Sequence, residues 1–154
     1  KRLWNLLQWT HTRVHEASRC DSKKTIEMRK KKSELKKLQD ELWELCKQIT
    51  RRRYKQFDDS YRCFTCGAFV EVPHTGHVIT DSTCSTEMSY SLDNLRLQCY
   101  ACNIHKSGNW QAFYQKLGKE YIDNLIKRNN ESKGKKYDIL WFKSKVQEYK
   151  NLDK

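Results

Sequence analysis

The chain carries two pairs of cysteines whose spacing suits metal binding. Cys63 and Cys66 form one CxxC pair, and Cys99 and Cys102 form a second after 32 intervening residues. Four thiolates make a closed tetrahedral zinc site, which stabilises a short polar segment and leaves no coordination position open for catalysis. We therefore expect a structural Zn²⁺ ion bound by these four cysteines.

The remaining cysteines stand alone, and the total of seven is odd. An odd total argues against a framework of disulfides and favours a reducing compartment. We expect Cys20, Cys46 and Cys84 to be ordinary free thiols. A zinc site in which His74 or His105 replaces one of the paired cysteines is a weaker alternative.

Polar residues with a second kind of chemistry lie between and just after the two pairs. His77 follows a glycine, Asn94 precedes the second pair, and Asn103 comes directly after Cys102. This order resembles the HNH, or ββα-metal, nuclease motif. Phosphodiester hydrolysis needs a base to activate water and a divalent ion to stabilise charge on the phosphate. Histidine, with an ordinary pKa of about 6.5, suits the base, and an amide oxygen suits Mg²⁺.

By that resemblance each of the three polar residues has an expected role. His77 is the candidate general base, Asn94 a residue that orders a loop, and Asn103 a ligand of a catalytic Mg²⁺ or Mn²⁺ ion. The zinc ion would then act as a scaffold that holds the hairpin and the following helix in register.

One position departs from the HNH pattern. Many HNH enzymes carry an aspartate immediately before the base, as a second metal ligand, and this chain has Gly76 there. His74, Asp81 and His105 are the residues that could fill the gap. We expect His74, because in an extended strand it shares a face with position 76.

Residues 61–126 carry a more specific motif than the general HNH pattern. The chain reads CxxCG, then GH, then NxxxxCxxCNxHKSGN, and then a helix ending KLGKEYIDNL. This pattern resembles the NinG (Rap) recombination endonucleases of lambdoid phages, which also have glycine before the histidine. The resemblance implies a structure-selective endonuclease that acts on branched DNA, such as a Holliday junction or a D-loop, in the cytoplasm of an infected bacterium. The alternative is a non-catalytic zinc module that binds DNA in phage replication or recombination, and Gly76 is its best argument.

The charge of the chain also favours a nucleic acid partner. Lys and Arg number 31 against 19 Asp and Glu, a net charge of +12. The excess lies in residues 1–62 and 110–154, whereas residues 63–109 carry 2 basic and 4 acidic residues. Each phosphate that a cation neutralises releases counterions, so the flanks would supply the affinity for DNA. The candidate contacts to DNA are Arg51, Arg52, Arg53, His105 and Lys106.

These residues must be positioned by a fold that we predict to be of the α+β class. Its centre is a small zinc-stapled ββα-metal (HNH) core over residues 61–109. A basic helical region over residues 1–60 precedes the core, and C-terminal helices over residues 110–154 pack on it. No apolar run approaches the ~20 residues that span a bilayer, and no signal-peptide pattern opens the chain, so we expect no membrane partner.

The basic region is predicted to hold a short helix over residues 1–20 and a long helix over about residues 22–55. A heptad-like apolar seam runs along the long helix and comprises Met28, Leu35, Leu38, Leu42, Leu45 and Ile49. The seam either pairs with another copy, giving a homodimer, or folds back on the helix that carries Trp4 and Trp9.

The rest of the chain shows shorter patterns. β-prone residues at 69–72 and 77–80 predict a hairpin, whose loop over residues 81–91 leads to a helix starting near Cys99 or Cys102. Helical spacing predicts helices over residues 110–117 and 120–127, bent at Gly118, and a last helix around residues 139–149.

Overall fold

A computed structural model describes the backbone of residues 2–153 and the side chains of residues 24–153. The chain divides into two compact units, residues 1–37 and residues 38–154. The predicted packing of Trp4 and Trp9 and the predicted free thiol of Cys20 fall outside the described side chains. The second unit begins inside the first helix, so its boundary lies earlier than the predicted start of the core at residue 61.

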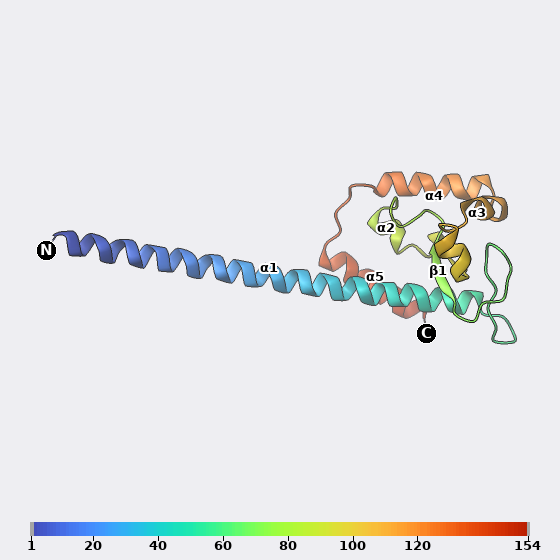
Figure 1. Cartoon of the computed structure of the whole chain (residues 1–154), viewed down its shortest axis with the longest axis horizontal. Coiled ribbons are helices and arrows are strands. Elements are labelled where there is room, and N and C mark those ends of the chain that lie inside the picture. The colour runs from blue at the N-terminus through green and yellow to red at the C-terminus, as the bar shows by residue number, and fades with distance from the viewer. Residues whose placement is uncertain (1, 154) are drawn as a thin grey trace. The chain divides into compact units, whose positions relative to one another are not determined.

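The first helix, α1 (Arg2–Tyr54), is continuous, which corrects the prediction of two helices (Figure 1). Residues 2–54 contain neither glycine nor proline, so no residue in this stretch breaks the backbone hydrogen bonding. The predicted start of the long helix near residue 22 therefore lies within α1.

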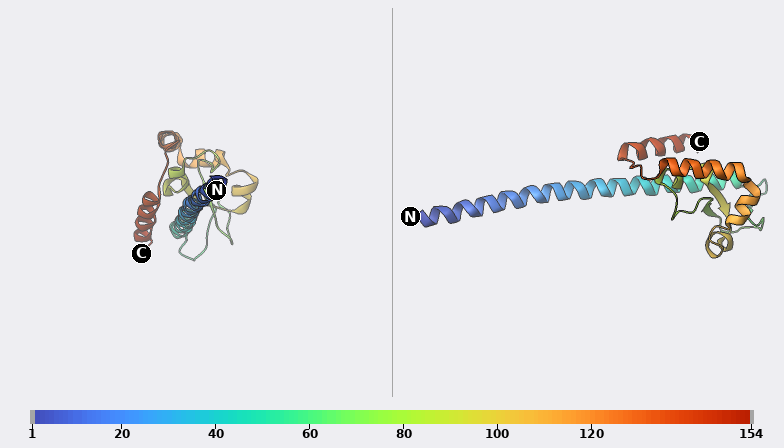
Figure 2. Two further views of the ribbon diagram at one scale, coloured as in Figure 1. Left: turned by 90° about the vertical axis from the view of Figure 1, so that its left-hand side faces the viewer. Right: turned by 90° about the horizontal axis from the view of Figure 1, so that it is seen from above.

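The predicted seam is buried only in its second half. Leu42, Leu45 and Ile49 are buried, whereas Met28 is 71% exposed. Helix α5 (Ile139–Leu152) lies beside the C-terminal half of α1 (Figures 1 and 2). This half of the seam therefore serves the core of the second unit itself.

Specific polar contacts join α1 to the rest of the second unit. Lys150 forms an ion pair of 2.6 Å with Glu41. The Cys46 thiol and the Tyr149 hydroxyl both donate to the backbone carbonyl of Tyr90, at 3.4 and 2.8 Å. These contacts fix the end of α1 and helix α5 against the loop that carries Tyr90.

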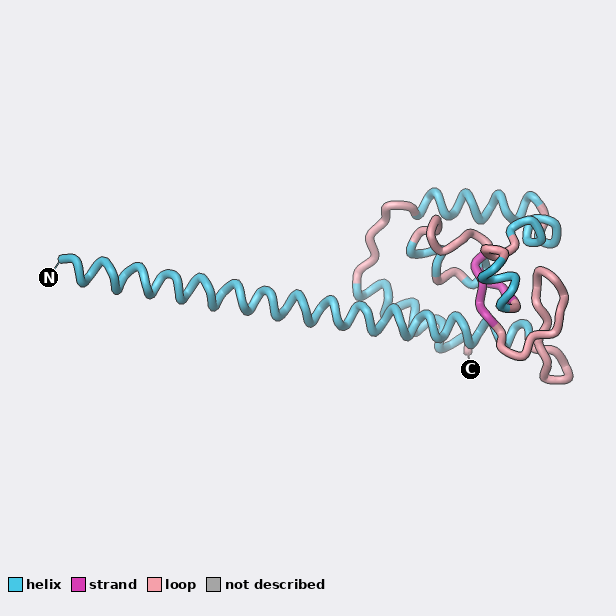
Figure 3. The backbone as a smooth tube through the Cα atoms, in the orientation of Figure 1, coloured by secondary structure: helices cyan, strands magenta, loops and turns pink. Residues whose placement is uncertain are grey.

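The structure contains a small antiparallel sheet (Figure 3). Strand β1 (His74–His77) pairs with β2 (Leu95–Gln98), with His74 opposite Gln98 and His77 opposite Leu95. The strands therefore differ from the predicted stretches, because β1 lies between residues 72 and 78 and β2 was not predicted. Residues 70–72 lie outside the strands, and Phe69 makes only an isolated bridge to Arg62.

Short helical turns complete the connection around the sheet. The loop between the strands contains α2 (Thr86–Ser89) and the 3₁₀ turn η1 (Leu92–Asn94). The helical turn η2 (Ala101–His105) follows β2, and its hydrogen bonds are of the wide π type. The chain therefore runs strand, strand, helical turn, in the predicted order.

Two predicted helices and the bend between them are confirmed. Helix α3 (Trp110–Leu117) and helix α4 (Lys119–Ser132) meet at Gly118, whose φ of +80° suits a residue without a side chain. The α4 helix is longer than predicted and ends near Gly134. A buried apolar cluster joins these helices to the sheet and α2, comprising Val78, Ile79, Met88, Phe113, Ile122 and Leu125.

The structure is thus rich in helices and contains a small sheet, which agrees with the predicted α+β class. Within the described part of the chain, every helix is too short or too polar to traverse a lipid bilayer.

Candidate metal centre and active site

The two cysteine pairs meet, as predicted. The ligand atoms of Cys63, Cys66, Cys99 and Cys102 all lie within 4.8 Å of one another. The Sγ atoms of Cys66 and Cys99 are 3.8 Å apart, and all four thiols are free of disulfides. Four sulfurs at this separation can hold a metal ion such as zinc, which suits thiolate ligands.

Local backbone geometry explains why the sulfurs converge. The Gly67 N–H donates to the carbonyl of Cys63 at 2.9 Å, and the φ of Gly67 is +76°, which turns the first pair back on itself. In the second pair the Cys102 N–H donates to the Sγ of Cys99 at 3.4 Å. Each CxxC pair is therefore a turn whose two thiols point the same way.

The environment of Cys63 favours its ionised form. Burial raises the pKa of its thiol, but hydrogen bonds from the Thr65 hydroxyl and from nearby backbone N–H groups together lower it to about 6. The Thr65 Oγ1 lies 3.2 Å from the Cys63 Sγ. A thiolate is the form that binds metal, so the cluster already supplies one anionic ligand near neutral pH.

His74 and His105 both lie against the same aromatic ring, outside the sulfur cluster. Their rings meet that of Tyr100 edge to face, with centroids 5.5 Å and 5.1 Å apart. All four candidate ligands in the sulfur cluster are cysteines. The alternative zinc site with a histidine ligand therefore loses its basis.

His77 is held on two sides. Its Nε2 atom lies 3.0 Å from the backbone carbonyl oxygen of Ser89. A carbonyl oxygen only accepts hydrogen bonds, so Nε2 carries the proton and Nδ1 is left as the acceptor. The Trp43 ring stacks on the imidazole, with centroids 5.3 Å apart and planes at 5°. The orientation of the ring is thus fixed by two helices, α1 through Trp43 and α2 through Ser89.

Asn94 orders the loop that holds His77. Its fully buried amide accepts from the Ile79 N–H at 2.7 Å and donates to the carbonyls of Ile79 and Met88, at 3.1 and 3.2 Å. These bonds tie the segment after β1 to helix α2. Because Ser89 follows Met88 directly, Asn94 also fixes the carbonyl that His77 contacts.

A depression on the surface brings His77 and Asn103 together with Asp81. Its lining comprises Trp43, Thr75, His77, Thr80, Asp81, Ser82, Asn103, Ser107 and Gly108. The ligand atoms of His77 and Asp81 lie within 4.8 Å of each other. Of the three residues considered for the missing carboxylate position, Asp81 is the one that the fold brings to His77.

We expected His74 to supply the second metal ligand, but the fold places it elsewhere. It lies in a different depression, together with Cys99 and Tyr100. Position 76 and His74 do share a face of β1, but His74 is not among the residues that line the depression containing His77. The side chain of Asp81 reaches His77 because the loop after β1 turns back, which strand alternation alone does not reveal.

The packing around Gly76 accounts for the absence of a side chain there. A Cβ atom at this position would lie 2.0 Å from Gln98 Oε1 and 2.9 Å from Asn103 Oδ1. Gln98 is fully buried, and its Nε2 donates to Thr65 Oγ1 at 3.1 Å and to the Gly108 carbonyl at 2.7 Å. An aspartate at position 76 would have to displace this amide. Gln98 was not predicted as a site residue, because its side chain alternates with apolar ones in β2 like that of Arg96 and gives no distinct signal.

The predicted DNA contacts have mixed surroundings. Arg51, His105 and Lys106 are exposed. Arg52 caps the end of α5, since its guanidinium donates to the carbonyls of Leu152 and Asp153. This contact gives Arg52 a structural role within the second unit.

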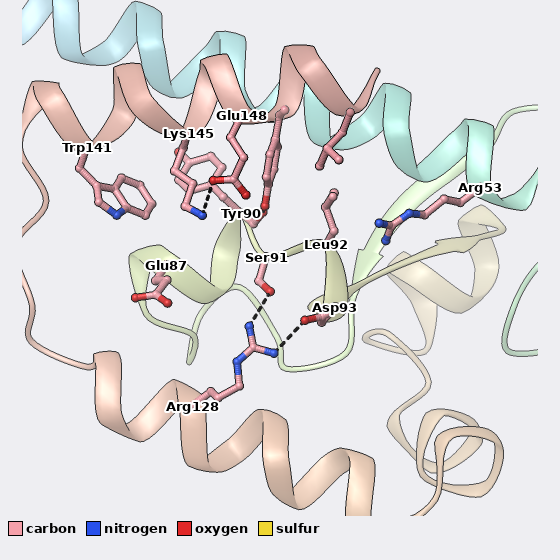
Figure 4. Close-up of a pocket in the computed structure, with 12 residues that line it drawn as sticks. Arg53, Glu87, Tyr90, Ser91, Leu92, Asp93, Arg128, Trp141, Lys145 and Glu148 are labelled. Carbon is pink, nitrogen blue, oxygen red and sulfur yellow. Dashed lines mark hydrogen bonds and ion pairs between the residues drawn. The ribbon is translucent and has the colours of Figure 1, made fainter. Parts of the chain in front are cut away.

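Arg53 lines a pocket beneath α5 (Figure 4). Two other cations of that pocket are already paired. Arg128 contacts Asp93 at 2.8 Å, and Lys145 contacts Glu148 at 2.8 Å. Because the carboxylates offset these cations, the pocket is a poor site for a phosphate group.

Comparison with known proteins gives one match. The family model described as Bacteriophage Lambda NinG protein matches residues 7–154. No curated protein matches the chain, and no solved structure matches it.

Proposed function

Since the chain belongs to the NinG family of phage proteins, we propose that it is a metal-dependent DNA endonuclease that hydrolyses phosphodiester bonds. The proposed active site is of the HNH type and lies in the depression that contains His77, Asp81 and Asn103. Branched recombination intermediates, a Holliday junction or a D-loop, are the proposed substrates. The family membership and the site chemistry support this proposal from independent directions.

The observation that carries the proposal is the hydrogen bond of His77 to Ser89. With Nε2 donating to the carbonyl, Nδ1 keeps a free lone pair. In the proposed reaction Nδ1 takes a proton from the water molecule that attacks the phosphorus atom. A base must be held in a fixed orientation, and this contact fixes the ring and leaves Nδ1 as the acceptor of the neutral imidazole.

Asp81 and Asn103 are the residues that would hold a catalytic Mg²⁺ or Mn²⁺ ion. Both offer oxygen ligands, which hard divalent ions prefer, and both line the depression beside His77. Such an ion supplies stabilisation of the charge that develops on the phosphate and the leaving oxygen. Asp81 thereby replaces the aspartate that many HNH enzymes carry at the position of Gly76.

The four-cysteine cluster is proposed to bind a structural Zn²⁺ ion. Cys99 and Cys102 flank the start of η2, and Asn103 follows at once, so the ion would fix the helical turn that presents the Asn103 amide. The Asn109 amide also donates to the Cys102 sulfur, at 3.7 Å, which links the turn to the start of α3.

A non-catalytic DNA-binding module was the competing hypothesis, and it rested on Gly76. The contacts of Gly76 with Gln98 and Asn103 give that glycine a packing role of its own. A carboxylate beside His77 is supplied by Asp81. The glycine is therefore no longer an argument against catalysis.

The test is cleavage of labelled DNA by the zinc-loaded protein. A four-way junction and a linear duplex of matched sequence are incubated in Mg²⁺, Mn²⁺ and EDTA. We expect nicks near the branch in Mg²⁺ or Mn²⁺, weaker cutting of the duplex, and none in EDTA. Salt-sensitive binding without cleavage in every metal would refute the nuclease and restore the binding module.

A further inference from the structure

Cys84 lies beside two residues of the candidate active site, His77 and Asp81, and the proposed nuclease chemistry assigns it no role. The ligand atoms of His77, Asp81 and Cys84 all lie within 4.8 Å of one another. They offer an imidazole nitrogen, a carboxylate oxygen and a sulfur. This is a different ligand set from the oxygens of Asp81 and Asn103 on which the proposed nuclease depends.

The separations of the three groups suit a single ion. The Sγ of Cys84 lies 3.9 Å from Oδ1 of Asp81. Sulfur and oxygen ligands of one tetrahedral zinc ion are about 3.5 Å apart, given Zn–S and Zn–O bonds of about 2.3 and 2.0 Å. The observed 3.9 Å is close to this distance, and the Asp81 side chain is exposed and can adjust.

The loop that carries these residues is already held in place. The Ser89 hydroxyl lies 3.0 Å from the Cys84 sulfur and 3.3 Å from Asp81 Oδ1. The carbonyl of the same serine contacts His77. One residue of α2 thus gathers all three candidate ligands, and little loop ordering would remain to oppose binding of an ion.

We propose that His77, Asp81 and Cys84 form a second binding site, selective for Zn²⁺ or a similar borderline divalent ion such as Co²⁺. Imidazole and thiolate favour these ions over Mg²⁺, which takes oxygen ligands. His77 would bind the ion through a ring nitrogen, and Nε2 is the nitrogen that lies 3.0 Å from the carbonyl oxygen of Ser89.

The second site makes zinc an inhibitor of the proposed nuclease. This part of the inference rests on the proposed function. A zinc ion on Nδ1 would take the lone pair that accepts the proton from water, and a zinc ion on Nε2 would displace the Ser89 contact that orients the ring. Asp81 would also be withdrawn from the Mg²⁺ or Mn²⁺ site. The chain would therefore need zinc at the four cysteines and exclude it from the active site.

The binding part is tested by counting zinc ions. The full chain is equilibrated with excess Zn²⁺ against a weak chelator, and metal is measured by mass spectrometry. We expect two zinc ions per chain in the parent protein and one in Cys84→Ser and in Asp81→Asn. Cys46→Ser, which alters a buried thiol elsewhere, is the matched control and should keep two.

Either of two results would overturn the site. One zinc ion per chain in the folded parent protein leaves no second site, and two ions in Cys84→Ser place the second ion elsewhere. Circular dichroism of each variant identifies any loss that comes from unfolding. Asp81→Asn provides an independent second variant, so failure of Cys84→Ser to fold leaves the site testable.

The inhibition part is tested by adding Zn²⁺ to cleavage reactions that contain Mg²⁺. Each variant is compared with itself, with and without zinc. We expect at least about a tenfold loss of rate in the parent protein and a much smaller loss in Cys84→Ser. Equal losses in both would refute inhibition through this site. If the parent protein cuts no DNA in any metal, the proposed function fails, whereas the zinc count still decides the site.

Discussion

Trp43 of α1 lies face to face with His77 of β1, with ring centroids 5.3 Å apart and ring planes at 5°. The stacking joins the end of the basic N-terminal helix to the candidate base. It complements the Ser89 contact, because the hydrogen bond fixes one ring nitrogen and the indole fixes the plane of the ring. Helix α1 therefore contacts the candidate base directly, in addition to carrying the basic residues that are predicted to contact DNA.

Trp43→Ala should lower the rate of cleavage about tenfold, because loss of an aromatic contact frees the imidazole to rotate. Trp43→Phe should retain most of the rate, since a smaller ring still covers the imidazole. The measurement is the single-turnover rate at saturating DNA, which separates cleavage from binding. Trp110→Ala, at an exposed tryptophan in α3, is the control. An unchanged rate in Trp43→Ala would show that the stacking has no bearing on the chemistry.

Gly76→Ala should destabilise the zinc-loaded protein by about 1–3 kcal/mol, the usual cost of forcing extra atoms into a packed interior. The new Cβ would meet the buried amide oxygen of Gln98 at 2.0 Å. Gly76→Asp should be worse, although it restores the residue common in HNH enzymes. Urea denaturation measures both.

The matched control for position 76 is the double variant Gly76→Ala with Gln98→Ala. Removing the Gln98 amide makes room for the added methyl group, so the two changes should be less costly together than the sum of each alone. Strict additivity would contradict the assigned clash.

Cys66→Ser should release the structural zinc ion and lower the melting temperature by at least about 10 °C, because binding energy of the metal is folding energy. Cys66 is exposed, so the substitution itself disturbs little packing. Zinc content and thermal unfolding are measured on the same samples. A variant that keeps both the metal and the melting temperature would refute the four-cysteine site.

Stability should fall as the pH rises from about 9 towards 12. Burial raises the pKa of the Cys46 thiol from 9.0 to about 12, so the folded state holds its proton where the unfolded chain has lost it. The contribution is complete below pH 9 and disappears as the pH passes through the folded value. Cys46→Ala should show a shallower decline, measured by urea denaturation at each pH. An identical pH profile would contradict this assignment.

The parts that could be predicted from the sequence depend on local spacing. The two CxxC pairs specify their own turns, and the Gly118 bend between α3 and α4 follows from a residue that adopts positive φ. The seam residues Leu42, Leu45 and Ile49 were recognised by period and are buried. Their partner could not be inferred, because packing against the same chain and pairing with a second copy require the same pattern.

The predictions that the structure corrected concern places where the chain turns, or was expected to turn, between elements. The sequence predicted a helix start near residue 22, but helix propensity on both sides gives one continuous helix. Asp81 reaches His77 only because its loop is folded back by the buried Asn94 amide. The reason for Gly76 lies in Gln98, 22 residues away, and becomes visible only when β1 pairs with β2.

The most direct test of the central claim is a comparison of His77→Ala with His74→Ala on the four-way junction in Mg²⁺ or Mn²⁺. Both histidines belong to β1, but only His77 lies in the proposed active site. We predict that His77→Ala folds, binds zinc and DNA like the parent protein, and loses at least about a hundredfold in cleavage rate. His74→Ala should cut at nearly the parental rate. Cleavage by His77→Ala at the parental rate would contradict the account.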